Sequence, residues 1–386
     1  MPPPNGADAS IPWAQQQLAP QRVWPLTKGG GVVVGVVDTG VDASTPQLAG
    51  GKVLPGFDVT AAAGRPADDD CVGHGTFLAG IIGASPASDT GFAGVAPDVT
   101  ILPVRVASSL VEGAPGALNP AAIGRGIRTA VDSGARVINV SASTSVPDKE
   151  LASAVAYAAE RDVVVVASAG NGAKDGDPAT YPASYPTVIA VGAVDSAGQQ
   201  APFSPTGSHV SLVAPGVDVT SVGPGGPGQW QGSGTSYAAP FVTGTAALVR
   251  AYHPGLTAPQ VKRRLETTAN HPATALPDPT LGWGTVNPLA AVTAVVPEEG
   301  ANGQPVLVGP PAARAADITP PDEVGPILVT VAVLGVIGTA FVLVWVCRLC
   351  GAGNRRGWGP SRVMRVVSHN PTPKERRDAP ARGKSA

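Results

Sequence analysis

Five short runs of apolar, mostly β-branched residues recur along this 386-residue chain and limit its fold more than any other feature. The first covers residues 31–37 and ends at Asp38, and the others cover residues 99–104, 136–140, 163–167 and 188–192. Such runs are typical of strands buried on both faces of a parallel sheet. Helix-like stretches, such as residues 120–133 and 148–161, lie between several of them. We therefore predict an α/β domain whose mainly parallel sheet carries helices on both faces.

Three more helices are predicted after residue 236. Residues 237–252 are rich in Ala and Gly and predict a tightly packed interior helix. Residues 257–270 form the next helix, in which Gln260 is placed for a capping box. A last helix ends near residue 296.

Charged side chains are scarce, because Asp, Glu, Lys and Arg make up only 14% of the chain and the formal net charge is −2. Proteins that bind nucleic acid carry a basic face or stripe. We therefore expect no nucleic-acid partner.

Residues 327–346 are twenty residues without a charge, which is the length needed to cross the core of a bilayer. Ten Lys and Arg residues follow within residues 348–386, whereas acidic residues precede the stretch. Positive charge on the cytoplasmic side predicts a single-pass protein of the cell membrane with its N-terminal domain outside. The predicted parts are an N-terminal extension (1–24), an extracytoplasmic domain (25–296), a Pro-rich linker (297–326), a transmembrane helix (327–347) and a basic cytoplasmic tail (348–386).

Export of this domain requires a signal, and residues 1–6 carry neither a basic start nor an apolar stretch. We expect either a start that lies upstream or a chain close to its mature form.

The cysteines leave further alternatives open. Cys347 and Cys350 lie at the inner membrane edge, where palmitoylation, reduced thiols and metal binding all fit. Cys71, in the exported domain, is predicted to be a semi-buried, inert thiol.

Three motifs supply the groups that activate a hydroxyl: Asp38-Thr39-Gly40, Gly73-His74-Gly75-Thr76 and Gly234-Thr235-Ser236. Asp38 ends a predicted strand, at the edge of a parallel sheet where active sites lie. Ser236 opens a predicted helix, whose N-terminus favours a developing oxyanion. In a Ser-His-Asp triad the imidazole takes the proton of the hydroxyl and the carboxylate orients the imidazole. We predict that Asp38, His74 and Ser236 catalyse acyl transfer.

A loop of small residues after the predicted strand 163–167 presents Asn171. An Asn amide together with a backbone N–H is one way to build an oxyanion hole. We predict that Asn171 and the backbone N–H of Ser236 form it.

With these residues in place, the chain resembles the subtilisin-like (S8) serine peptidases from about residue 13 to residue 296. The resemblance implies a three-layer fold, with Asp38, His74 and Ser236 as the triad and Asn171 in the oxyanion hole. It also implies an acyl-enzyme, protein or peptide substrates, and no metal or other cofactor. The predicted anchor behind a Pro-rich linker resembles the mycosins, proteases attached to type VII secretion systems, and implies a type VII membrane complex as partner.

The chain departs from this family in several places. Ser141, Ala142 and Ser143 stand where one side of the substrate cleft usually reads Ser-Leu-Gly, so the Ser143 side chain is expected to narrow the first specificity pocket. Tyr237 follows the nucleophile where the family often has Met. Mycosins tend to carry disulfides in this domain, whereas Cys71 has no exported partner.

Three alternatives compete with this interpretation. Asp38 and Asp132 each stand in an Asp-Thr/Ser-Gly tripeptide, as in aspartic proteases, but Asp132 follows a helix-like stretch. The run at residues 68–70 has three Asp side chains, for which a solvated loop is favoured over a calcium site. The domain can also serve mainly as a structural subunit of a secretion complex, with latent or narrow peptidase activity.

Overall fold

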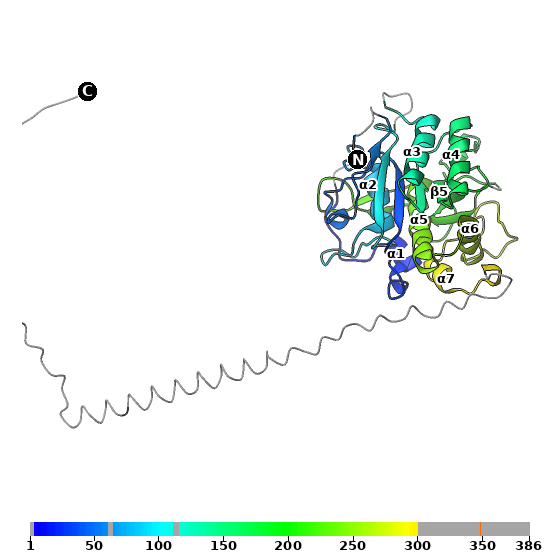
Figure 1. Ribbon diagram of the computed structural model, residues 1–386. Coiled ribbons are helices and arrows are strands. Elements are labelled where there is room, and N and C mark those ends of the chain that lie inside the picture. Colours follow the sequence, from blue (N-terminus) through cyan, green and yellow to red (C-terminus); the bar gives the residue numbers. More distant parts are fainter. Residues whose placement is uncertain (1–3, 61–64, 111–115, 208, 300–347, 349–386) are drawn as a thin grey trace, which may run out of the picture. The chain divides into compact units, whose positions relative to one another are not determined.

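A seven-stranded sheet in the order β2-β3-β1-β4-β5-β6-β7 runs through the structure, a computed structural model, and every neighbouring pair in it is parallel (Figure 1). The structure describes residues 4–60, 65–110, 116–207, 209–299 and 348. Its sheet strands are β1 (Val33–Asp38), β2 (Phe57–Asp58), β3 (Thr100–Arg105), β4 (Val137–Val140), β5 (Val164–Ser168), β6 (Ile189–Val194) and β7 (Leu212–Pro215). β8 (Val219–Ser221) and β9 (Trp230–Gly232) form a separate antiparallel pair.

Helices cover both faces of the sheet (Figure 1). The α-helices are α1 (Trp13–Leu18), α2 (His74–Gly83), α3 (Pro120–Asp132), α4 (Lys149–Glu160), α5 (Thr235–Tyr252), α6 (Ala258–Thr267) and α7 (Pro288–Thr293). Short 3-10 turns lie at Pro20–Arg22, Pro46–Leu48, Ala173–Asp175 and Pro297–Glu299. The chain divides into two units, residues 1–309 and 310–386, and all these elements belong to the first.

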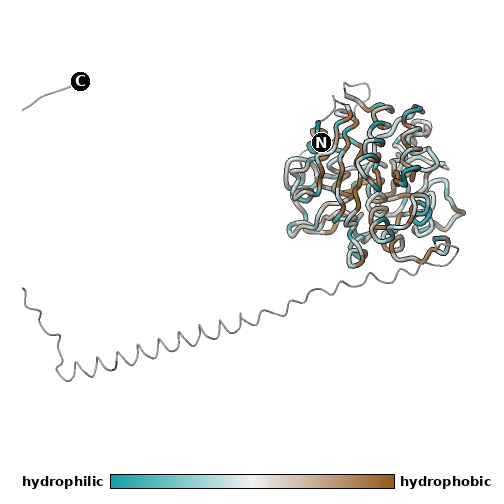
Figure 2. The backbone as a smooth tube through the Cα atoms, viewed as in Figure 1, coloured by the Kyte–Doolittle hydropathy of each residue, from teal (hydrophilic) through white to brown (hydrophobic). Residues whose placement is uncertain are grey.

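Two apolar clusters fill the space between the sheet and its helices. On one face Val34 and Val36 of β1 belong to the cluster that contains the buried side chains of α2 and α5. On the other face Val37 of β1 belongs to the cluster of α3 and α4. Successive side chains of a strand point to opposite faces, so a strand buried on both faces must be apolar throughout. Figure 2 accordingly has its hydrophobic colour along the strands.

The predicted α/β architecture is confirmed. The five apolar runs are β1, β3, β4, β5 and β6, and α3 to α6 begin within two residues of their predicted starts. The predicted capping box at the start of α6 joins Thr257 and Gln260. β2, β7 and the β8–β9 pair were not predicted, and these strands have only two to four residues each.

Other predictions concern the ends of the chain and Cys71. The thiol of Cys71 is free and exposed, so the prediction of a semi-buried thiol was wrong: at this point of the loop the buried side chain is that of Asp70. Residues 4–24 lie against the domain: Asn5 pairs with Gln229, and α1 buries Ala14 and Leu18. The described residues contain no helix with the length and apolar character of a membrane span. The predicted span and most of the linker and tail, with Cys347 and Cys350, lie outside the described residues.

The strand order reverses at β1, whose neighbours are β3 on one side and β4 on the other. In open parallel sheets, ligands bind at such a switch point, beyond the carboxyl ends of the strands. Asp38 is the last residue of β1 and Ser141 directly follows β4. The fold therefore points to this edge for the chemistry.

Candidate active site

Asp38 and His74 meet at the carboxyl edge of the sheet. His74 is the first residue of α2, and its Nδ1 lies 2.7 Å from Oδ1 of Asp38. The backbone N–H of Thr39 donates to the same oxygen at 2.9 Å. Both Asp38 and His74 are buried. Since a carboxylate only accepts, Nδ1 of His74 carries the proton, and the lone pair of the neutral ring is at Nε2.

The charge balance of this pair favours the protonated ring. Burial lowers the pKa of the His74 imidazole, but the charge and hydrogen bond of Asp38, with a further contribution from the charge of Asp70, outweigh burial and raise it above 6.5. Asp38 therefore both orients the imidazole and stabilises the imidazolium.

Ser236 is the second residue of α5, at the helix N-terminus, where backbone N–H groups lack intrahelical partners. Its Oγ donates to the carbonyl oxygen of Ser141 at 3.1 Å, and Oγ of Ser141 donates to the Ser236 carbonyl oxygen at 2.8 Å. Asn139 of β4 donates to Oγ of Ser141 at 2.9 Å. The predicted nucleophile is thus joined to the end of β4.

Asn171 follows β5 and is tied to the start of α5. Its Oδ1 accepts the backbone N–H of Thr235 at 2.9 Å and lies 3.1 Å from Oγ1 of Thr235. These contacts assign Oδ1 as the acceptor and leave the donor Nδ2 available to another group. Thr235 itself is fully buried, and its Oγ1 also bonds to Gly170. No role was predicted for Thr235, because a Thr between Gly and Ser does not by itself indicate a contact with a distant loop.

An aromatic side chain lies against the imidazole. The ring of Tyr237 is 5.3 Å from that of His74 and 4.6 Å from that of Phe77. Burial, with a smaller contribution from Asp38, raises the pKa of the Tyr237 phenol. Tyr237 therefore serves as a neutral apolar wall beside His74.

The predicted cleft segment continues from β4. Ser141 and Ala142 are buried and Ser143 is half-buried. Thr144, next in the chain, exchanges two backbone hydrogen bonds with Tyr181, at 3.0 and 2.8 Å. The segment is therefore fixed, just beyond the carboxyl end of β4, by its pairing with Tyr181.

The acidic residues of the rejected alternatives have other partners. Asp132 ends α3 and accepts a hydrogen bond from the hydroxyl of Tyr157 at 2.6 Å, so it does not pair with Asp38 as an aspartic protease requires. Asp70 is only 5% exposed. The interpretation of residues 68–70 as a solvated loop was therefore wrong for Asp70, which bonds to groups beside His74.

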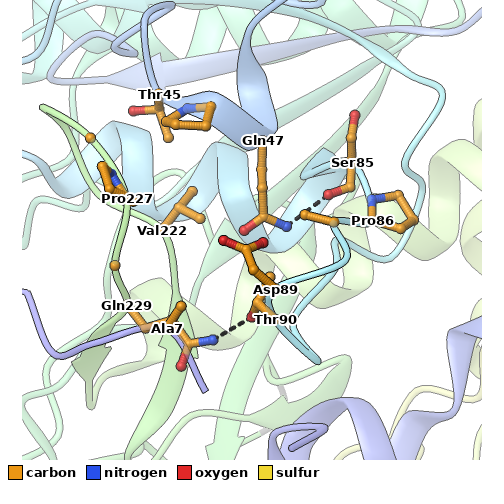
Figure 3. Close-up of a pocket in the computed structure, with 14 residues that line it drawn as sticks. Ala7, Thr45, Gln47, Ser85, Pro86, Asp89, Thr90, Val222, Pro227 and Gln229 are labelled. Atoms are coloured by element: carbon orange, nitrogen blue, oxygen red, sulfur yellow. Dashed lines mark hydrogen bonds between the residues drawn. The ribbon is translucent and has the colours of Figure 1, made fainter. Parts of the chain in front are cut away.

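A cavity of about 130 Å³ lies apart from these residues (Figure 3). Its walls come from residues 45–47, 85–90 and 222–229 and from Ala7. Gln47 donates to the carbonyl oxygen of Ser85 at 2.7 Å, and Gln229 donates to Oγ1 of Thr90 at 2.6 Å. None of the predicted catalytic residues lines this cavity.

Comparison with known proteins identifies the family. The model of the subtilase family (peptidase family S8) matches residues 29–284, more than half of the chain. The chain belongs to the subtilase family. Mycosin-4 of Mycobacterium tuberculosis is 40% identical to this subtilase over 342 residues, which cover 78% of this chain and 74% of the relative. Subtilisin DY of Bacillus licheniformis is 40% identical over 246 residues, which cover 63% of this chain and 85% of the relative.

Solved structures agree with this assignment. The crystal structure of MycP1 with its N-terminal propeptide removed has a TM-score of 0.65 at 34% identity, covering 75% of this chain and 99% of that one. The structure of the MycP3 protease from the type VII (ESX-3) secretion system also has a TM-score of 0.65 at 34% identity, covering 75% and 91%. This chain is therefore a mycosin-like serine protease with a subtilisin-like α/β fold.

Proposed function

We propose that this subtilase is an endopeptidase in which Ser236 attacks the scissile carbonyl while Nε2 of His74 takes the hydroxyl proton. The observation that carries the proposal is the 2.7 Å contact between Nδ1 of His74 and Asp38, which leaves Nε2 as the base. Before attack, the Ser236 hydroxyl exchanges its bond with the Ser141 carbonyl for one with Nε2. The His74 imidazolium then gives this proton to the leaving amine as the scissile C–N bond breaks. The acyl-enzyme that results is hydrolysed by water, with the neutral His74 again as base. These steps need no metal or other cofactor.

In the proposed reaction the oxyanion is held by Nδ2 of Asn171 and the backbone N–H of Ser236. The bonds from Thr235 to Oδ1 of Asn171 support this role, because they direct Nδ2 away from Thr235. Loss of one such donor costs about 10²- to 10³-fold in turnover. Ser141, Ala142 and Ser143 line one side of the proposed substrate cleft, and the Ser143 side chain restricts the first specificity pocket.

We further propose that the peptidase domain (25–296), preceded by the extension 1–24, lies outside the cell membrane. The Pro-rich linker 297–326 joins it to a transmembrane helix at 327–347 and a cytoplasmic tail at 348–386. The likeness to MycP3 from a type VII secretion system supports a type VII membrane complex as partner and protein or peptide substrates. Protease accessibility of the domain in intact cells tests this topology.

Active-site labelling tests the chemistry. The purified full-length chain in detergent is treated with a fluorophosphonate probe, and the labelled peptide is identified by mass spectrometry. We expect a single adduct on Ser236 that is absent from Ser236→Ala. A wild-type chain that folds but never takes up label at Ser236 contradicts the proposed peptidase.

A second candidate function is a structural subunit with latent or narrow peptidase activity. The solved structure of MycP1 described as an essential component of the type VII (ESX-1) secretion system favours testing it. Cells carrying Ser236→Ala are compared with cells that lack the chain. Restored export by the variant supports the structural role, whereas lost export supports a processing role.

A further inference from the structure

Asp70 has a carboxylate that is buried and surrounded by donors, and no step of the proposed mechanism uses it. Its Oδ1 accepts from Oγ1 of Thr39 at 2.9 Å and from the backbone N–H groups of Val72 and Gly73 at 3.1 and 2.8 Å. Its Oδ2 accepts from the backbone N–H and from Oγ1 of Thr76 at 2.9 and 2.8 Å. The two oxygens of Asp70 thus take part in five hydrogen bonds, three of them from backbone N–H groups.

These bonds connect the two segments that carry Asp38 and His74. Thr39 directly follows Asp38, donates its backbone N–H to Asp38 and its hydroxyl to Asp70, and accepts the backbone N–H of Gly75 at 3.0 Å. On the other side, Gly73 is the N-cap of α2 and has no side chain with which to cap the helix. Asp70 replaces that missing cap, because it accepts the N–H groups of Gly73 and Thr76.

A second side chain holds the loop of Asp70 against the same turn. Arg105, the last residue of β3, donates to the carbonyl oxygen of Thr39 at 2.9 Å and to Asp58 at 3.2 Å, and it pairs with Asp69. In the sheet Arg105 lies beside Asp38 in register. The loop, the turn after β1 and the start of α2 are thus one bonded unit.

We propose that Asp70 is a positioning residue for the peptidase reaction: it holds the His74 imidazole against Asp38, and its fixed charge favours the imidazolium that forms when His74 takes the Ser236 proton. The inference rests on the proposed function. Three groups face the imidazole: the carboxylate of Asp38 from β1, the charge of Asp70 from the loop before α2, and the neutral ring of Tyr237 from α5. Burial lowers the pKa of His74, and Asp38 followed by Asp70 raises it.

Kinetics of three variants of the full-length chain test the proposal. Asp70→Asn removes the charge and sets an amide donor against the Thr76 N–H. We expect kcat to fall about 10- to 100-fold with KM nearly unchanged, and the acidic limb of kcat/KM to move to lower pH. Thr39→Val removes the hydroxyl that bonds to Asp70 and Gly75, so it should lower kcat. Because it keeps every charge, it should leave the acidic limb of kcat/KM in place. Asp68→Asn, the control, removes the same charge from the same acidic run but none of the bonds above, and keeps the wild-type profile.

These readouts separate positioning from a merely structural role. If Asp70 only supports the fold, Asp70→Asn lowers the melting temperature and the folded fraction, while the acidic limb of the remaining enzyme stays in place. The proposal is overturned if Asp70→Asn leaves the acidic limb of kcat/KM in place and has a kcat, per folded molecule, within twofold of wild type.

A measurement that does not depend on turnover keeps the proposal testable if the wild type shows no activity. The chain has five histidines, so 13C labelling of histidine and a His74→Gln variant suffice to assign the His74 signal. The pKa of His74 is then read from its NMR titration in the Ser236→Ala background. We expect a lower pKa with Asp70→Asn than with Asp68→Asn. Equal values overturn the role of Asp70, whereas failure of wild-type labelling at Ser236 overturns only the peptidase.

Discussion

Gly75, the residue after His74, is the position where one added methyl group should separate activity from folding. Its Cα faces the turn that follows Asp38. A Cβ built on Gly75 would lie 2.0 Å from the carbonyl oxygen of Gly40 and 3.4 Å from Cβ of Asp38. Ordinary van der Waals contact begins at 3.4 Å, and both close partners are main chain or β-carbon atoms that cannot rotate away.

The shift that Gly75→Ala imposes follows from these distances. The new Cβ would lie about 1.4 Å closer to the Gly40 oxygen than ordinary contact allows. The start of α2 must therefore move by about 1 Å, even if the turn after Asp38 also shifts in part. A displacement of 1 Å stretches the 2.7 Å contact between His74 and Asp38 beyond hydrogen-bond range. Misplacement of this size costs about 10²-fold in rate. Overpacking costs about 1–3 kcal/mol of stability, which the better helix propensity of Ala offsets in part.

A second glycine of the same helix provides the matched control. In Gly83→Ala the new Cβ meets the side chain of Val99 at 2.8 Å, at the far end of α2. We expect both variants to lose stability in urea titrations, and only Gly75→Ala to lose about 10²-fold in kcat per folded molecule. A Gly75→Ala enzyme with kcat within threefold of wild type would refute the idea that this close approach positions His74.

Three further predictions follow from the site and the core. The pKa of His74 is raised and catalysis needs the neutral ring, so kcat/KM should rise with pH through an apparent pKa above 6.5. By linkage, the charged pair of His74 and Asp38 stabilises the fold below pH 6.5 and loses that contribution as the pH rises through the raised pKa. In urea titrations, the difference in unfolding free energy between wild type and His74→Gln should therefore become smaller at higher pH. Thr235→Val removes the hydroxyl beside Asn171 and should lower kcat about 10-fold with KM unchanged in steady-state assays. Arg250 is 3% exposed and donates to Leu256 and to Asp162, whose side chain is 44% exposed, so Arg250→Leu should cost about 1–3 kcal/mol in urea unfolding and leave kcat per folded molecule unaltered.

The elements that could be predicted are those whose own residues form a recognisable pattern. β1 and β5 are continuous apolar runs, and burial on both faces of a parallel sheet demands just that pattern. β2 has two residues and β9 three, and strands this short exist only because a neighbour pairs with them. No local pattern can report such pairing.

The same limit applies to the acidic run before His74. Residues 68–70 are chemically identical in the sequence, yet Asp69 pairs with Arg105 and Asp70 bonds to Thr39, whereas the Asp68 side chain takes no part in these bonds. Both partners lie more than 30 residues away along the chain. The one sequence feature that indicates a role for Asp70 is its position shortly before a helix, since acidic residues favour helix N-termini.

The two halves of the proposed site are held by the same kinds of interaction. Helices α2 and α5 are anchored by Phe77 and Phe241, both fully buried in the larger apolar cluster. Polar bonds fix the start of each helix, from Asp70 to Thr76 in α2 and from Asn171 to Thr235 in α5, and each is worth about 1–3 kcal/mol. Neither half therefore opens without loss of the shared apolar cluster. Denaturant should thus abolish fluorophosphonate labelling of Ser236 together with the unfolding transition, and loss of labelling well below its midpoint would contradict this reasoning.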